Sequence, residues 1–308
     1  MPHPRSRACQ RQASCCSNKV ARQLAPMAYH LMINVMEAPF GGSPQLAFRR
    51  AVIAAFDSLR PISRLHAAGL KLARTRPCES LLGRHMQEQI EIDTNPLVRC
   101  GMAASSIETA FHMHRLYEAS ASIAIRTVSE ALPSGKARIV QRIVPSDMID
   151  PNICRDAHLA ALDTICRSIA RHSAAGPPEV GLKLSWVAKR LGLERSAAFD
   201  AALALEEDPT LKVSELAKRL GWQVRTLERW LNREGLTAMA MKRGAMIIHA
   251  TSLLPGELSL TEVAHAAGYS DLAHMSRGFM KSCSLTPTQL RASVRRRVKT
   301  PSPPIARG

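Results

Sequence analysis

The chain has 308 residues, a length that favours more than one domain. Of these residues, 46% are hydrophobic and 22% are charged, which is typical of a globular protein. Its formal net charge of +17 favours a polyanionic partner, either nucleic acid or an anionic membrane surface. No apolar run reaches the roughly 18 residues of a membrane span, so we expect no membrane insertion. The eight cysteines include no Cys-x-x-Cys pair and follow no signal peptide, which predicts a reducing, cytoplasmic setting.

The first half of the chain predicts a basic tail followed by an α+β domain. Residues 1–26 are rich in Arg, Ser and Gln, which is typical of a flexible tail, and also of a transit peptide or an over-extended start of translation. Residues 27–172 are predicted to form an effector-binding or dimerisation domain. The apolar spacing predicts one helix and otherwise mixed structure in residues 44–100, then a β-hairpin in residues 122–144 and a helix over residues 156–169.

Two further segments are predicted to be connections. Residues 173–195 include Gly176-Pro177-Pro178 and are assigned to a linker, and the Pro-rich residues 298–308 to a disordered tail. Residues 186–193 resemble the start of a helix-turn-helix, but the helix after them is apolar on more than one face and carries few cations. We therefore expect a packing helix there and no contact with DNA.

An internal repeat lies in the C-terminal third, where residues 213–222 align with residues 260–269. In both copies, apolar residues at i, i+3, i+4 and i+7 predict one buried helix face. Gly221 and Gly268 then permit a sharp turn, and an aromatic residue follows each glycine. This pattern is the signature of a helix-turn-helix, so the sequence predicts two such units.

A second helix follows each turn and is predicted to enter the major groove of DNA. Its inward residues are Leu227 with Trp230 or Leu231 in the first copy, and Met275 with Phe279 in the second. The predicted DNA-binding residues are Arg225, Thr226, Glu228, Arg229, Leu272, Ala273, His274, Ser276 and Arg277. The predicted phosphate contacts are Arg295, Arg296 and Arg297.

The helix ends differ between the two copies. Ser259 and Glu262 have the spacing of a capping box, whereas Lys212 occupies the corresponding N-cap position of the first copy. Residues 236–254 are predicted to form one helix that connects the units, with Gly244 as a defect inside it.

From residue 196 to residue 291 the arrangement resembles the DNA-binding domain of the AraC/XylS family. The most specific segments are residues 258–264, 267–271, 274–277 and 285–287. The resemblance implies a mainly α protein whose all-α domain, residues 196–297, places two recognition helices in successive major grooves. It also implies a transcription regulator that binds double-stranded DNA and contacts RNA polymerase. This sequence departs from the family pattern at Met246, Met275, Cys283-Ser284 and Leu290.

Residues 109–171 are similar in element order to the arabinose-binding type of ligand domain, which implies an unidentified small-molecule effector and a possible homodimer. No enzymatic activity, cofactor or metal is predicted. His112 and His114 with Glu118 suggest a metal site, but positions i and i+2 diverge on a helix and no second cluster is near in sequence. Two alternatives stay open: a non-specific architectural DNA-binding protein, and a methyl-accepting DNA repair regulator with zinc-binding cysteines, for which Cys9, Cys15 and Cys16 lack paired spacing.

Overall fold

The computed structural model describes residues 27–75, 79–121, 123–175 and 180–295. The predicted tails at residues 1–26 and 298–308, and with them Arg296, Arg297 and the N-terminal cysteines, lie outside the described residues. Within the described part of the chain, none of the helices is both long enough and apolar enough to cross a membrane.

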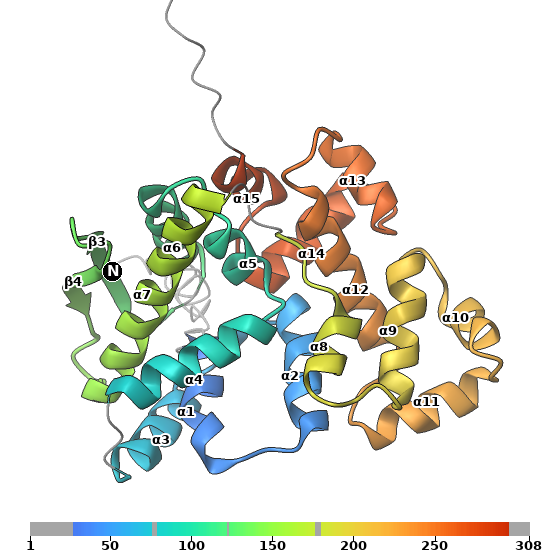
Figure 1. Cartoon of the computed structure of the whole chain (residues 1–308), viewed down its shortest axis with the longest axis horizontal. Helices are drawn as coiled ribbons and strands as arrows, with labels where there is room; N and C mark the ends of the chain where they lie inside the picture. The colour runs from blue at the N-terminus through green and yellow to red at the C-terminus, as the bar shows by residue number, and fades with distance from the viewer. Residues whose placement is uncertain (1–26, 76–78, 122, 176–179, 296–308) are drawn as a thin grey trace, which may run out of the picture.

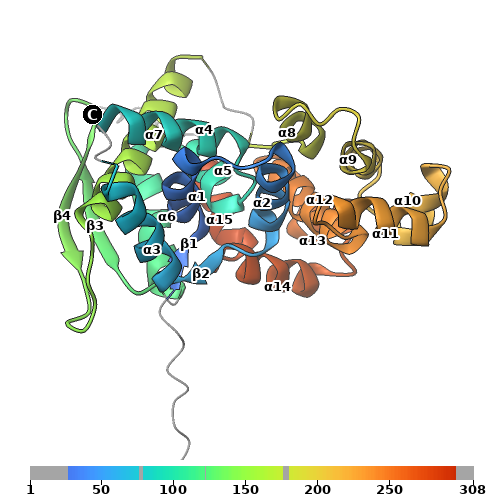
Figure 2. The same ribbon diagram turned by 90° about the horizontal axis from the view of Figure 1, so that it is seen from below.

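The N-terminal part is mainly helical, with two small antiparallel strand pairs (Figures 1 and 2). In chain order its elements are β1 (Met27–Tyr29), α1 (His30–Glu37), the 3-10 turn η1 (Ala38–Phe40), α2 (Pro44–Phe56), β2 (Leu59–Pro61), α3 (Ile62–Ala73), α4 (Glu79–Ile92), α5 (Pro96–Met102), α6 (Ile107–Ser120), β3 (Arg126–Ala131), β4 (Ala137–Ile143) and α7 (Asn152–Ala175).

The prediction of one helix and otherwise mixed structure in residues 44–100 is wrong, because α2 to α5 occupy most of this region. The predicted helix corresponds to α2, whereas α3, α4 and α5 were not predicted. Pro96 lies in the first turn of α5, where a missing N–H costs no hydrogen bond. The side chain of Asn95 caps the same turn by accepting from the backbone N–H of Leu97.

The predicted hairpin and the helix after it are confirmed. β3 and β4 pair in antiparallel register from Arg126 opposite Ile143 to Ala131 opposite Ala137. Gly135 has a φ of 75° in the connecting turn, a conformation that glycine adopts without strain. The helix predicted over residues 156–169 is part of the longer α7, which packs on β4 and α4.

The C-terminal part is all-α, as predicted. Its helices are α8 (Leu184–Arg190), α9 (Ala197–Glu207), α10 (Val213–Arg219), α11 (Val224–Arg233), α12 (Ala238–Leu253), α13 (Leu260–Ala266), α14 (Leu272–Cys283) and α15 (Pro287–Val294). α12 is the predicted connecting helix, and it packs on both the α10–α11 pair and α13 (Figure 2).

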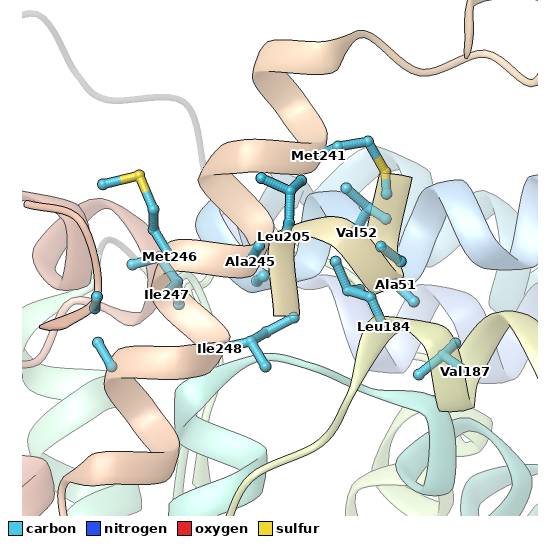
Figure 3. Packing of buried hydrophobic residues seen from close by; sticks show 14 of the residues in the cluster. Ala51, Val52, Leu184, Val187, Leu205, Met241, Ala245, Met246, Ile247 and Ile248 are labelled. Carbon is cyan, nitrogen blue, oxygen red and sulfur yellow. The ribbon is translucent and has the colours of Figure 1, made fainter. Parts of the chain in front are cut away.

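One hydrophobic core joins the two parts of the chain. α2 packs against α8, α12 and α14, while α5 and α6 pack against α15 (Figures 1 and 2). In Figure 3, Val52 of α2 lies with Leu184 of α8, Leu205 of α9 and Met241 of α12 in a single buried cluster. α2 thus belongs to the same core as the C-terminal helices, although α3 to α7 lie between them in the sequence.

Gly244 has a structural reason inside α12. A Cβ at this position would lie 3.3 Å from the carbonyl oxygen of Val52 and 3.4 Å from its Cγ1. The missing side chain therefore lets α2 approach α12 closely. Its lower helix propensity is offset by the packing that this approach allows.

A buried set of hydrogen bonds also connects α2 to the C-terminal helices. The Asn95 side-chain amide donates to the carbonyl oxygens of Ala54 (2.7 Å) and Ser282 (3.1 Å). The Ser282 hydroxyl donates in turn to the carbonyl oxygen of Ala55 at the end of α2. Asn95 and Ser282 are both fully buried, so this contact links α2, α5 and α14 without help from solvent.

Candidate DNA-binding surface

The two repeated turns have the same backbone geometry. Gly221 and Gly268 have φ values of 71° and 82°. The residue after each glycine donates its backbone N–H to an alanine carbonyl of the preceding helix, from Trp222 to Ala217 and from Tyr269 to Ala264, at 2.9 Å in both copies. The sequence repeat therefore corresponds to a repeated three-dimensional unit.

The two glycines differ in their surroundings, which predicts different costs of substitution. A Cβ on Gly221 would meet nothing within 4 Å, whereas one on Gly268 would lie 2.8 Å from the carbonyl oxygen of Pro209. Gly221→Ala should lower the free energy of unfolding by about 1–2 kcal/mol, the cost of a left-handed alanine. Gly268→Ala should cost clearly more, because backbone must move as well. Equal losses in denaturant unfolding would contradict this difference.

The second unit has well-formed helix N-termini. The Asp271 carboxylate accepts from the backbone N–H of His274 (2.6 Å), and this hydrogen bond holds the pKa of Asp271 below its usual value. Ser259 and Glu262 form the predicted capping box at the start of α13. In the first unit, Glu215 accepts from the backbone N–H of Lys212 (2.7 Å), which completes half of such a box.

The departure from the family pattern at residue 284 falls at the end of α14. Ser284 is the only non-glycine residue in the described part of the chain with a positive φ, at 55°. A left-handed backbone costs a non-glycine residue about 1–2 kcal/mol. We expect Ser284→Gly to raise the free energy of unfolding by about 1 kcal/mol, as measured by chemical denaturation. An unchanged or lowered stability would show that the Ser284 side chain makes up for the strain.

In the first recognition helix, α11, Leu227 and Leu231 are the buried residues, whereas Trp230 is 40% exposed and lies against Arg233. Of the predicted DNA-binding residues, Arg225 and Arg229 are exposed, and Thr226 and Glu228 are half-buried. The Glu228 carboxylate accepts from the backbone N–H of Ala238 (3.3 Å), so it also caps α12. The two arginines are thus the more accessible of these four predicted contact residues.

In the second recognition helix, α14, Met275 and Phe279 are fully buried, as predicted. Ala273, His274 and Arg277 are exposed, while Leu272 and Ser276 are half-buried. The His274 ring packs edge-on against Tyr269 and lies 3.2 Å from the Ser270 hydroxyl, which orients it at the start of the helix. The described residues therefore place predicted contacts from both helices on the surface.

The recognition arginines form no direct ion pair among the described residues, although, besides the hydrogen bond from the backbone N–H of His274, the charge of Arg277 contributes to the lowered pKa of Asp271. Several carboxylates cap helices instead: Glu206 accepts from Ser185 at α8, and Glu234 accepts from the backbone N–H of Ala197 at α9. Across the described ranges, no carboxylate forms an ion pair with Arg225, Arg229 or Arg277. The positive charges of the recognition helices therefore remain available to an anionic partner.

A basic groove between α12 and α14 was not predicted. Its cationic lining residues are Lys242, Arg243, Arg277 and Lys281, and no acidic residue lines it within the described part of the chain. The Lys242 ammonium already donates hydrogen bonds to the carbonyl oxygens of Thr210 and Leu211, so it is less free than the other three to bind a ligand. The Lys242-Arg243 pair in the connecting helix is the sequence signal that could have indicated this groove.

Of the three predicted phosphate contacts, only Arg295 falls within the described ranges. Its guanidinium donates to the carbonyl oxygen of Gly256 (2.5 Å), in the segment that joins α12 to α13. This hydrogen bond holds the side chain beside the second unit. A role in phosphate binding therefore stays a prediction for all three arginines.

Residues 186–190 belong to a packing helix, α8, and residues 191–193 form the turn that follows it. Part of the segment predicted as a linker is α8, which packs on α9 and α2. Gly192 has a φ of 72°, and Leu193 donates to the Ala188 carbonyl at 2.9 Å, which repeats the turn of the two DNA-binding units. The following helix α9 exposes Asp200, whose charge would repel DNA, while Glu207 forms an ion pair with Arg219.

Comparison with known proteins agrees with this geometry. No curated protein and no solved structure matches the chain significantly. Residues 216–293 match a family model described as a helix-turn-helix domain, and this range runs from α10 to α15 across both repeated units. The chain thus carries an AraC-type helix-turn-helix domain, which indicates a DNA-binding transcription regulator.

Proposed function

We propose that the protein recognises a specific operator by placing α11 and α14 in two successive major grooves. The exposed Arg225 and Arg229 of α11 and the exposed Arg277 of α14, none of them ion-paired within the described ranges, are the observation that supports this proposal most strongly. α12 has 16 residues and so spans about 24 Å, which suits units that bind about 34 Å apart on one face of a duplex.

The N-terminal part is proposed to regulate DNA binding through the joint core. A ligand or a second copy bound to this part acts on α12, α14 and α15 through α2, α5 and α6, which pack on them. An effector, a homodimer and a contact with RNA polymerase belong to this proposal. The four free cysteines among the described residues, Cys100, Cys154, Cys166 and Cys283, are buried, which suits a reducing compartment.

The test is selection of DNA by the full-length protein from a pool of random duplexes at physiological salt. We expect enrichment of one motif with two information-rich segments about 10 base pairs apart, and binding at least about 10³-fold tighter than to scrambled duplex. Enrichment without a motif would favour the architectural alternative. One segment alone would mean that only one unit reads bases.

A further inference from the structure

The N-terminal part contains a polar cluster that the DNA-binding function does not use. His114 and Glu118 lie one turn apart on α6, with the His114 Nε2 and a Glu118 oxygen 3.8 Å apart. His158 of α7 completes the cluster, and its ring packs edge-on against that of His114 with centroids 5.1 Å apart. One ligand atom from each residue lies within 4.8 Å of the other two. His112, which the sequence places beside His114, is exposed and lies outside this cluster.

The cluster lacks protein partners that would explain it as a purely structural network. Among the described residues, His158 Nε2 and His114 Nδ1 are buried and have no hydrogen-bond partner. A buried polar atom without a protein partner is costly unless a water, an ion or a ligand group satisfies it. Glu118, in contrast to the two histidines, has a protein partner: both of its oxygens accept from the backbone N–H of Thr127, at 2.9 and 3.2 Å. This hydrogen bond fixes the carboxylate beside the two imidazoles.

The chemistry of the three side chains suits a metal ion. Two imidazole nitrogens and one carboxylate oxygen form a ligand set that is common for divalent transition-metal ions. The nearby cation Arg142 is compensated by its ion pair with Asp150, in which one guanidinium nitrogen lies 2.9 Å from a carboxylate oxygen.

The cluster also lies at the wall of a cavity of about 100 Å³. The rest of its lining is largely apolar and includes Leu97, Ile125, Leu162 and Ile165. This volume is large enough for several water molecules or a small ligand group, since one water needs about 10–15 Å³. Three protein ligands leave a coordination position for water or for a ligand, as in sites with two histidines and one carboxylate.

We propose that His114, Glu118 and His158 bind a divalent transition-metal ion, with an open coordination position that faces the apolar cavity. An oxygen or nitrogen donor on a small, mostly apolar molecule fits that position. α6 carries two of the three ligands and packs directly on α15, where the backbone N–H of Ser105 just before α6 donates to the carbonyl oxygen of Ser293. The site thus has a short structural route to the DNA-binding domain.

The experiment uses untagged, full-length protein that has been stripped with a chelator and then titrated with Zn²⁺ by calorimetry and with Co²⁺ by absorption. We expect one equivalent of each metal to bind, with a Co²⁺ spectrum that lacks thiolate charge-transfer bands. Glu118→Gln, His114→Ala and His158→Ala should each weaken binding by at least about 10–100-fold. His112→Ala is the matched control, because His112 is exposed on the same helix, and it should bind as wild type does.

Glu118→Gln keeps an oxygen that accepts from Thr127, so it separates loss of a ligand from loss of folding if a histidine variant is unstable. No stoichiometric binding by the wild type, thiolate bands with Co²⁺, or equal binding by Glu118→Gln and wild type would each overturn the proposal. DNA binding by the same samples is measured in parallel. Operator binding that persists without any metal binding would refute this site and leave the proposed function intact.

Discussion

Replacement of Asn95 by Ala should lower the free energy of unfolding by about 2–4 kcal/mol. The change removes the donor to the carbonyl oxygens of Ala54 and Ser282 and the acceptor for the backbone N–H of Leu97, all at a fully buried position. Each buried group that loses its partner costs about 1–3 kcal/mol. Urea unfolding of the full-length protein measures the loss.

Two further variants identify which interaction of Asn95 causes the loss of stability. Asn95→Asp keeps the acceptor that caps α5 but points a carboxylate at two carbonyl oxygens, so it should be about as destabilising as Asn95→Ala. Gln87→Ala changes an exposed amide on α4 and should stay within about 0.5 kcal/mol of wild type. A stable Asn95→Asp protein would show that Asn95 acts only as a helix cap and does not fasten α2 to α14.

Replacement of Arg229 or Arg277 by Ala should weaken binding to the true operator by about 1–3 kcal/mol, and binding to random DNA much less. Both side chains are exposed on the recognition helices, and neither forms an ion pair within the described residues. Each lies one turn after another exposed candidate contact, Arg225 or Ala273. Competition binding on operator and scrambled duplexes at several salt concentrations gives both affinities.

The matched charge control is the cluster Arg295 to Arg297, which follows the last helix. Its replacement by Ala should weaken all sequences alike and reduce the salt dependence by roughly 0.9 log unit for each phosphate that is no longer neutralised. If Arg229→Ala and Arg277→Ala weaken operator and scrambled DNA equally, these residues bind phosphate and do not read bases.

The local design of the DNA-binding region could be predicted from sequence because each unit is encoded by nearby residues. The spacing of apolar residues, the glycine and the following aromatic residue determine the turn at Gly221 and at Gly268. The recognition-helix faces follow from the same period, since Leu227 and Phe279 are buried and Arg229 and Arg277 are exposed. The choice between Trp230 and Leu231 could not be made in this way, because both positions fit the apolar stripe.

The contacts between distant segments could not be predicted in the same way. Gly244 looks like a defect in a helix until Val52 is placed against it, and no local pattern relates the two. Likewise, His158 is 44 positions after His114 along the chain, so the cluster depends on how α6 and α7 pack. The helices α3 to α5 were missed in the same region, where the apolar spacing was assigned to one helix only.

Two coupled units that read adjacent grooves are the central claim, and footprinting of the full-length protein on its selected operator tests it most directly. Chemical protection of major-groove base edges at single-nucleotide resolution should show two protected segments on one face of the duplex, about 10 base pairs and roughly 34 Å apart. Arg229→Ala should expose bases in one segment, and Arg277→Ala bases in the other. A single protected segment, or uniform protection that neither variant changes, would contradict the account.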